Sequence, residues 1–139
     1  CTHGKLRWQA DEADGHPLLC IVSEEVPEAY LETLRQQGIS WIAAGKGRID
    51  LPKAMEALSE HFGVKRLAIV GGGHICGGFL EAGLIDEVSI MVAPGIDGRK
   101  GQTAVFDGIT DMGCNPFRLK LESVEQWPTD IVWLRYKMK

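Results

Sequence analysis

A run of three glycines is the segment of this sequence that points most directly to chemistry. Residues 66–70 form a short apolar run that leads straight into Gly71, Gly72 and Gly73, and apolar residues then recur at helical spacing. Such a turn presents backbone N–H groups at a helix N-terminus, where partial positive charge suits a phosphate or pyrophosphate. Glycine also lets a ligand approach the backbone closely, because it carries no Cβ. The segment predicts a phosphate-binding turn, with tight packing of strand and helix as the alternative explanation.

The spacing of the glycines excludes two familiar nucleotide-binding motifs. A G-x-G-x-x-G motif starting at Gly71 would need glycine where Cys76 stands. A Walker A loop would need lysine and a hydroxyl residue where Gly78 and Phe79 stand. The turn therefore belongs to neither an ordinary Rossmann site nor a P-loop.

The elements that must position this turn alternate between strands and helices. Residues 18–22 are predicted as a buried strand, followed by a helix that begins at Pro27 and ends at Gly38. Residues 39–44 form a second strand, and Asp50 caps a helix that closes at Gly63. Residues 66–70 form a third strand, and the helix after the glycines carries a stripe of Ile75, Phe79 and Ala82 and ends at Gly83. Strands joined by helices predict an α/β fold with parallel strands.

The rest of the chain is predicted to finish the sheet with antiparallel strands. Residues 88–92 form a further strand, and residues 94–115 form a glycine-rich loop. Apolar and polar residues then alternate from Phe117 to Leu121, the chain turns at residues 126–130, and residues 131–136 return as the second strand of a hairpin. The fold expected is a mixed, mostly parallel sheet with flanking helices and a C-terminal antiparallel hairpin.

Composition limits the class of protein. The chain has 139 residues, 45% of them hydrophobic and 24% charged, which predicts a single globular domain over residues 1–139. The net charge is −4 and the basic residues are dispersed, so we expect no nucleic-acid partner. No apolar run is long enough to cross a bilayer, so no membrane partner is expected. The four cysteines form no C-x-x-C pair, so we expect no metal site, no disulfide framework and a cytoplasmic location.

The first fifteen residues are polar, lack periodicity and do not begin with Met. We interpret the chain as the C-terminal part of a longer domain whose N-terminal portion is missing. The neighbouring acidic residues Asp86 and Glu87 are not predicted to do acid–base work, because they lie between a helix end and a strand start, at the edge opposite the glycine turn. Capping or solvated roles suit them better.

Three motifs together resemble a known family. The sequence has I-x-G-G-G at residues 69–73, L-x-x-G-L-I-D-E at 80–87 and A-P-x-x-D-G-R at 93–99. This order is similar to the reductase domain of bacterial riboflavin biosynthesis and to its relative dihydrofolate reductase, over residues 17–136. The resemblance implies a dihydrofolate-reductase-like fold that binds NADPH at the carboxyl ends of the strands, in line with the general rule for open α/β sheets. It also implies a homodimer.

The resemblance further implies roles for particular residues. The pyrophosphate of NADPH would be held by Gly71, Gly72, Gly73, His74 and Ile75, and the peptide between Gly71 and Gly72 would be cis. Ser23, at the end of the first strand, would contact the adenosine phosphate. Lys46 and Arg48, in the loop after the second strand, would offer cations to the 2′-phosphate that distinguishes NADPH from NADH, although such residues in loops are commonly only solvated. Arg99 and Lys100 are similar candidates.

The sequence also departs from the family. The residue before the glycines is Val70, where riboflavin pyrimidine reductases typically carry Glu, and the S-x-D-G motif that lines their substrate pocket is absent. The expected function is reduction of a ribosylaminopyrimidine to its ribitylamino form, with NADPH supplying the hydride, and these residues alone are expected to bind cofactor but turn over poorly. The alternatives are a dihydrofolate or pterin reductase and a non-catalytic nucleotide-binding domain.

Overall fold

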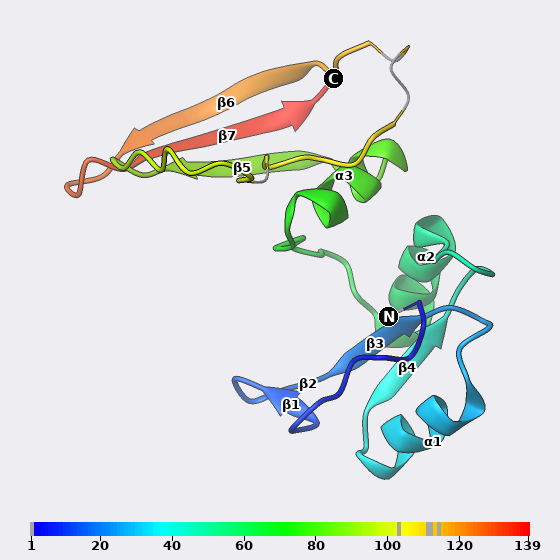
Figure 1. The fold of residues 1–139 in the computed structure, drawn as a ribbon. Helices are drawn as coiled ribbons and strands as arrows, with labels where there is room; N and C mark the ends of the chain where they lie inside the picture. Colours follow the sequence, from blue (N-terminus) through cyan, green and yellow to red (C-terminus); the bar gives the residue numbers. More distant parts are fainter. Residues whose placement is uncertain (1, 103, 111–112, 114) are drawn as a thin grey trace. The chain divides into compact units, whose positions relative to one another are not determined.

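A computed structural model describes residues 2–102, 104–110, 113 and 115–139. The chain divides into two compact units, residues 1–67 and 68–139, and each is described by itself (Figure 1). Helices and sheets occur in both units, so the predicted α/β class is confirmed. That the whole chain forms a single domain stays a prediction.

The first unit is a parallel strand pair covered by a helix on each face. Strands β3 (Leu19–Val22) and β4 (Ser40–Ala43) pair in parallel, with Leu19 opposite Ser40. Helix α1 (Glu28–Gln36) is the crossover between β3 and β4, and helix α2 (Leu51–Phe62) follows β4. The strand residues alternate between two apolar clusters, because successive side chains in a strand point to opposite faces. The α1 cluster contains Cys20, Val22, Val26, Tyr30, Leu34 and Ile39, and the α2 cluster contains Ile42, Ala44, Ala54 and Leu58.

The predicted ends of these helices are confirmed. The Asp50 carboxylate accepts a hydrogen bond from the Lys53 backbone N–H at 3.0 Å, which caps α2. At the other end Gly63 has φ +66°, the left-handed conformation that favours glycine. Gly38, with φ +71°, follows α1 in the same way. Pro27 lies one position earlier than expected, at the N-cap of α1.

A short hairpin precedes this core and was not predicted. Strands β1 (Glu12–Ala13) and β2 (His16–Pro17) pair through a tight turn in which Asp14 and Gly15 both have positive φ. Two left-handed residues in succession are what a two-residue hairpin turn requires. The hairpin carries no buried residue, which explains why the hydrophobic pattern gave no sign of it.

The second unit contains one helix and an antiparallel sheet. Helix α3 (Gly73–Glu81) follows the glycine run. Strands β5 (Glu87–Val92), β6 (Leu119–Gln126) and β7 (Val132–Met138) pair in the order β5-β7-β6, with β7 antiparallel to both neighbours. Strands β6 and β7 are the predicted terminal hairpin. The residues facing one side of this sheet are almost all apolar: Val88, Ile90, Val92, Leu119, Leu121, Val124, Val132, Leu134, Tyr136 and Met138.

Three expectations are corrected by the structure. Residues 66–70 form no strand, since no described strand lies beside them to complete a backbone ladder, and an apolar run alone cannot supply one. The peptide between Gly71 and Gly72 is trans, as are all described peptides, which is the low-energy form for a bond that does not precede proline. The buried face of α3 consists of Gly73, Gly77 and Phe79, whereas Ile75 is 55% exposed.

No helix in the described part of the chain is both long and apolar enough to cross a membrane.

Candidate cofactor-binding segments

The glycine turn exposes two backbone donors beside open space. Gly72 is the N-cap of α3, with φ −67° and ψ 170°, and its carbonyl accepts from the N–H groups of Ile75 at 2.9 Å and Cys76 at 3.1 Å. The N–H groups of Gly73 and His74 have no acceptor among the described residues, as expected for the first positions of a helix. A Cβ at Gly72 would meet nothing within 4 Å. A phosphate oxygen could therefore reach these two donors over Gly72.

The neighbouring glycines serve a different purpose. A Cβ at Gly73 would lie 2.4 Å from the Ala104 carbonyl oxygen, and one at Gly77 would lie 1.9 Å from the Asp107 carbonyl oxygen. The Asp107 N–H donates to the Gly73 carbonyl at 2.9 Å, which fixes residues 104–107 on this face of α3. Both explanations offered for the glycine run therefore apply, each to different residues. Packing explains Gly73, and likewise Gly77 further along the helix, whereas ligand approach is left as the explanation for Gly72.

The other predicted residues of this unit lie around the turn. The His74 side chain is 75% exposed, and its Nδ1 lies 3.8 Å from a carboxylate oxygen of Asp107. Val70 is 92% exposed. A Cβ at Gly71 would lie 2.8 Å from the Cβ of Ile75, an atom that no rotamer change can move, so Gly71 is closely packed against the first turn of α3. His74 is therefore accessible to a ligand as an additional donor.

Arg99 and Lys100, the other predicted cations, differ in how available they are to a phosphate. The Arg99 guanidinium donates to both carboxylate oxygens of Asp97, with Nε 2.8 Å from Oδ1. This pair holds the pKa of Asp97 below its usual range, because the guanidinium favours the charged carboxylate. Arg99 is thus engaged by its own loop, and Lys100 is exposed.

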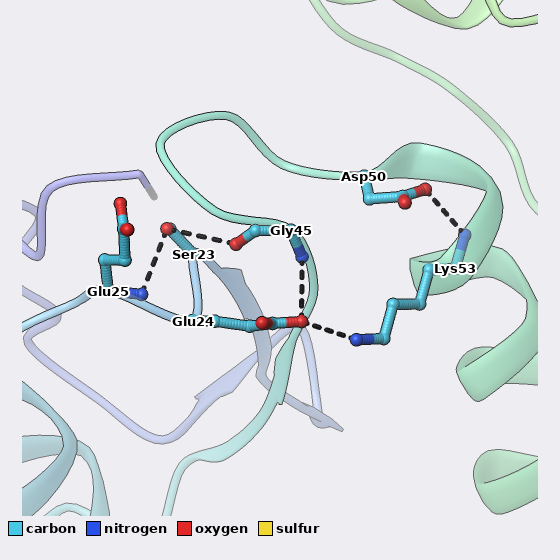
Figure 2. A network of polar contacts seen from close by, with 6 residues as sticks. All are labelled: Ser23, Glu24, Glu25, Gly45, Asp50 and Lys53. Atoms are coloured by element: carbon cyan, nitrogen blue, oxygen red, sulfur yellow. Dashed lines mark hydrogen bonds and ion pairs between the residues drawn. The ribbon is translucent and has the colours of Figure 1, made fainter.

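In the first unit, Ser23 connects the carboxyl ends of the parallel strands. Its side chain is buried, with the residue 1% exposed. The hydroxyl donates to the Gly45 carbonyl at 3.2 Å and accepts from the Glu25 N–H at 3.2 Å (Figure 2). Contact between Ser23 and a phosphate stays a prediction, and it would require the hydroxyl to exchange its present acceptor.

Two carboxylates that sequence reasoning did not select complete this strand edge. Glu24 accepts from the Gly45 N–H at 3.3 Å and forms an ion pair with Lys53 of α2 (Figure 2). Its hydrogen bond to Lys53 holds the pKa of Glu24 below its usual range and raises the pKa of Lys53. Glu25 accepts from the Gly47 N–H at 2.8 Å. Their position directly after a buried strand was the available signal, because the ends of parallel strands meet at one edge.

The loop after β4 carries Lys46 and Arg48, and its Gly47 N–H donates to Glu25. Lys46 and Arg48 flank Gly47 and are exposed, as the sequence suggested for loop residues. Gly45 permits the loop to turn back on itself: its φ is +79°, and a Cβ there would lie 2.4 Å from the Arg48 carbonyl oxygen. The loop is thus closely packed at its base and open to solvent at residues 46–48.

Asp86 and Glu87 lie where structural roles were expected. The Asp86 carbonyl accepts from the Met138 N–H at 3.0 Å, and the Glu87 carboxylate lies 3.8 Å from the Arg135 guanidinium across the sheet. Within the described ranges, no group of three or more His, Cys, Asp or Glu residues is placed to hold a metal ion.

Comparison with known proteins identifies a family and two similar reductases. A family model described as the RibD C-terminal domain matches residues 2–133. A curated relative named 2,5-diamino-6-ribosylamino-4(3H)-pyrimidinone 5′-phosphate reductase, from Methanothermobacter thermautotrophicus, is 31% identical over 128 residues, which cover 91% of this chain and 57% of the relative. The protein of the same name from Archaeoglobus fulgidus is 30% identical over 91 residues, covering 65% and 40%. The chain therefore spans about half the length of the curated relatives it matches.

Solved structures agree on the fold. A pyrimidine reductase-like protein from Corynebacterium diphtheriae matches with a TM-score of 0.72 and 25% identity, over 87% of this chain and 50% of its own. RibD from Acinetobacter baumannii matches with a TM-score of 0.69 and 22% identity, over 87% and 31%.

Proposed function

This chain belongs to the RibD C-terminal domain family, and on that basis we propose that it is the cofactor-binding part of an NADPH-dependent reductase. The substrate class is a ribosylaminopyrimidine, reduced to its ribitylamino form. Support for the substrate comes from the two relatives, which are named as reductases of a ribosylaminopyrimidinone 5′-phosphate. Support for the cofactor comes from one observation above all: the N–H groups at the start of α3, beside the open Gly72, have no acceptor among the residues that the structure describes.

The residues at the α3 N-terminus fit a pyrophosphate. The Gly73 and His74 N–H groups would donate to its oxygens, and the exposed His74 imidazole would add a donor from its side chain. Gly72 would allow the close approach that a larger residue blocks. The family resemblance suggests that Gly71 and Ile75 border the same group. When bound, NADPH would supply the hydride that reduces an imine-like carbon of the substrate, and the protein's part is to bind and orient.

The strand edge of the first unit would bind the adenosine phosphate. Ser23 would contact it after exchanging its bond to Gly45, or would act by holding the loop in place. Lys46 and Arg48 would supply positive charge to a 2′-phosphate, which favours NADPH over NADH. The resemblance also suggests a cytoplasmic homodimer. Sedimentation of the purified protein would test the dimer.

One residue favours a second candidate within the same class. Val70 precedes the glycines, where riboflavin pyrimidine reductases typically carry Glu and dihydrofolate reductases carry an apolar residue. A dihydrofolate or pterin substrate is therefore the alternative.

The test is oxidation of NADPH and of NADH by the full-length gene product with a panel of acceptors. The acceptors are 2,5-diamino-6-ribosylamino-4(3H)-pyrimidinone 5′-phosphate, the pyrimidine formed from it by loss of the 2-amino group, and dihydrofolate. Turnover of either pyrimidine with NADPH would support the proposal. Turnover of dihydrofolate alone would move the substrate to the pterins, and cofactor binding without turnover of any acceptor would indicate a non-catalytic nucleotide-binding protein.

A further inference from the structure

A carboxylate of the chain itself occupies an anion-accepting position at the strand edge of the first unit. The Gly47 N–H donates to the Glu25 carboxylate at 2.8 Å, and Gly47 has φ +66°. Lys46 and Arg48, the residues before and after Gly47 in the sequence, are both exposed. A backbone N–H in a loop that carries two cationic residues suits an anionic oxygen, and the structure shows one bound there.

The bond between Glu25 and Gly47 is set by the rigid base of the loop. Ser23 is buried and bonds both to the Glu25 N–H and to the Gly45 carbonyl, so it fixes the chain on each side of the contact. Gly45 is packed too closely to the Asp50 backbone to accept a side chain. Glu25 and Gly47 are themselves exposed, so another anion can displace the carboxylate without unfolding the loop.

The neighbouring Glu24 has a different role. Its charge is offset by Lys53, and its oxygen bonds to Gly45 at the base of the loop. Glu25 instead bonds to the exposed part of the loop, where the proposed function puts the adenosine phosphate. The two carboxylates therefore have separable effects.

We propose that Glu25 is a specificity-determining residue of this edge. Its carboxylate competes for the Gly47 N–H with a phosphate on the adenosine ribose, and so it lowers the preference for 2′-phosphorylated over unphosphorylated adenosine ligands. The inference rests on the proposed function, in which this edge receives the adenosine end of the cofactor.

The test is calorimetric titration of the chain with adenosine 2′,5′-bisphosphate, adenosine 5′-monophosphate and NADPH. The variant is Glu25→Ala, which removes both charge and acceptor. The control is Glu28→Ala, which removes an equal charge from the exposed first turn of α1. Glu25→Ala should bind the bisphosphate roughly three to ten times more tightly, since a competing charged hydrogen bond is lost at an exposed site, and should bind the monophosphate within about twofold of wild type. Glu28→Ala should leave both affinities within about twofold.

Other outcomes would separate a failure of the Glu25 proposal from a failure of the proposed function. An equal change for both ligands in Glu25→Ala, or an equal gain in Glu28→Ala, would overturn the role of Glu25 and leave the cofactor site in place. Failure of the wild-type chain to bind NADPH would refute the proposed function, and the inference with it. If Glu25→Ala does not fold, Glu25→Gln replaces it, because this variant keeps a neutral acceptor for the Gly47 N–H. A smaller gain in affinity is then expected, for the bisphosphate alone.

Discussion

Replacing Gly77 with alanine should destabilise the protein, although alanine favours helices. The new Cβ would lie 1.9 Å from the Asp107 carbonyl oxygen and 2.9 Å from its carbonyl carbon, and both are backbone atoms that no rotamer change can move. Residues 104–107 would have to shift, at a cost of about 1–3 kcal/mol for overpacking. The shift would also break the 2.9 Å bond from the Asp107 N–H to Gly73, worth about 1 kcal/mol. The helix gains about 1 kcal/mol from alanine, so the expected net loss is about 2 kcal/mol.

Urea denaturation followed by far-ultraviolet circular dichroism measures this loss. Hydrogen exchange of the Asp107 amide reports on the contact itself, and its protection should fall in Gly77→Ala. The control is Gly72→Ala, since that position is open and its φ of −67° suits any residue, so its stability should fall only by about 1 kcal/mol, the cost of a poorer N-cap, and the Asp107 amide should stay protected. A Gly77→Ala protein at least as stable as wild type, with the Asp107 amide still protected, would refute the packing argument.

Three further predictions concern the first unit. Asp50→Ala should lose about 1 kcal/mol of unfolding free energy in urea because α2 loses its cap, whereas Asp50→Asn, which can still cap, should lose little. Gly45→Ala should lose roughly 1–3 kcal/mol, since a Cβ there meets the backbone of Arg48 and the φ of +79° disfavours a side chain; a midpoint equal to that of wild type would contradict this. Ion pairing lowers the folded-state pKa of Glu24, so its contribution to stability is present above its unfolded-state pKa and is lost as the pH falls through the lowered value. Lys53→Met should therefore raise the pKa of Glu24, measured by carbon NMR titration, and weaken the acid dependence of the urea midpoint; an unchanged titration would contradict the assignment.

The sequence predicted best those elements whose local signals agree with their packing. Helix α2 has an Asp N-cap and a Gly C-terminus, and both are found. Its apolar stripe buries Ala54 and Leu58, whereas Phe62 in the last turn is 45% exposed. The hairpin of β6 and β7 was equally clear from its alternation. Residues 66–70 have the same apolar character but form no strand, because strand formation also depends on a neighbour that a local pattern cannot reveal.

The sequence located the glycine turn but did not show which of its glycines are open to a ligand. The glycine run was correctly placed before a helix, but nothing local distinguishes Gly72, which is open, from Gly73, which is packed against Ala104. That difference arises from a segment about thirty residues away in sequence. Likewise the bond from Gly47 to Glu25 joins two loops that the sequence separates by a helix and a strand.

Titration of the wild-type chain and of Gly72→Val with NADPH tests whether the glycine turn binds the cofactor. A Cβ at residue 72 meets nothing within 4 Å, so valine fits the free protein, with a stability cost of about 1 kcal/mol as a poorer N-cap. Wild type should bind NADPH, and Gly72→Val, although still folded, should not, because the valine side chain blocks approach to the Gly73 and His74 N–H groups. Equal affinity in the two proteins would contradict this expectation and remove the glycine turn as the cofactor site.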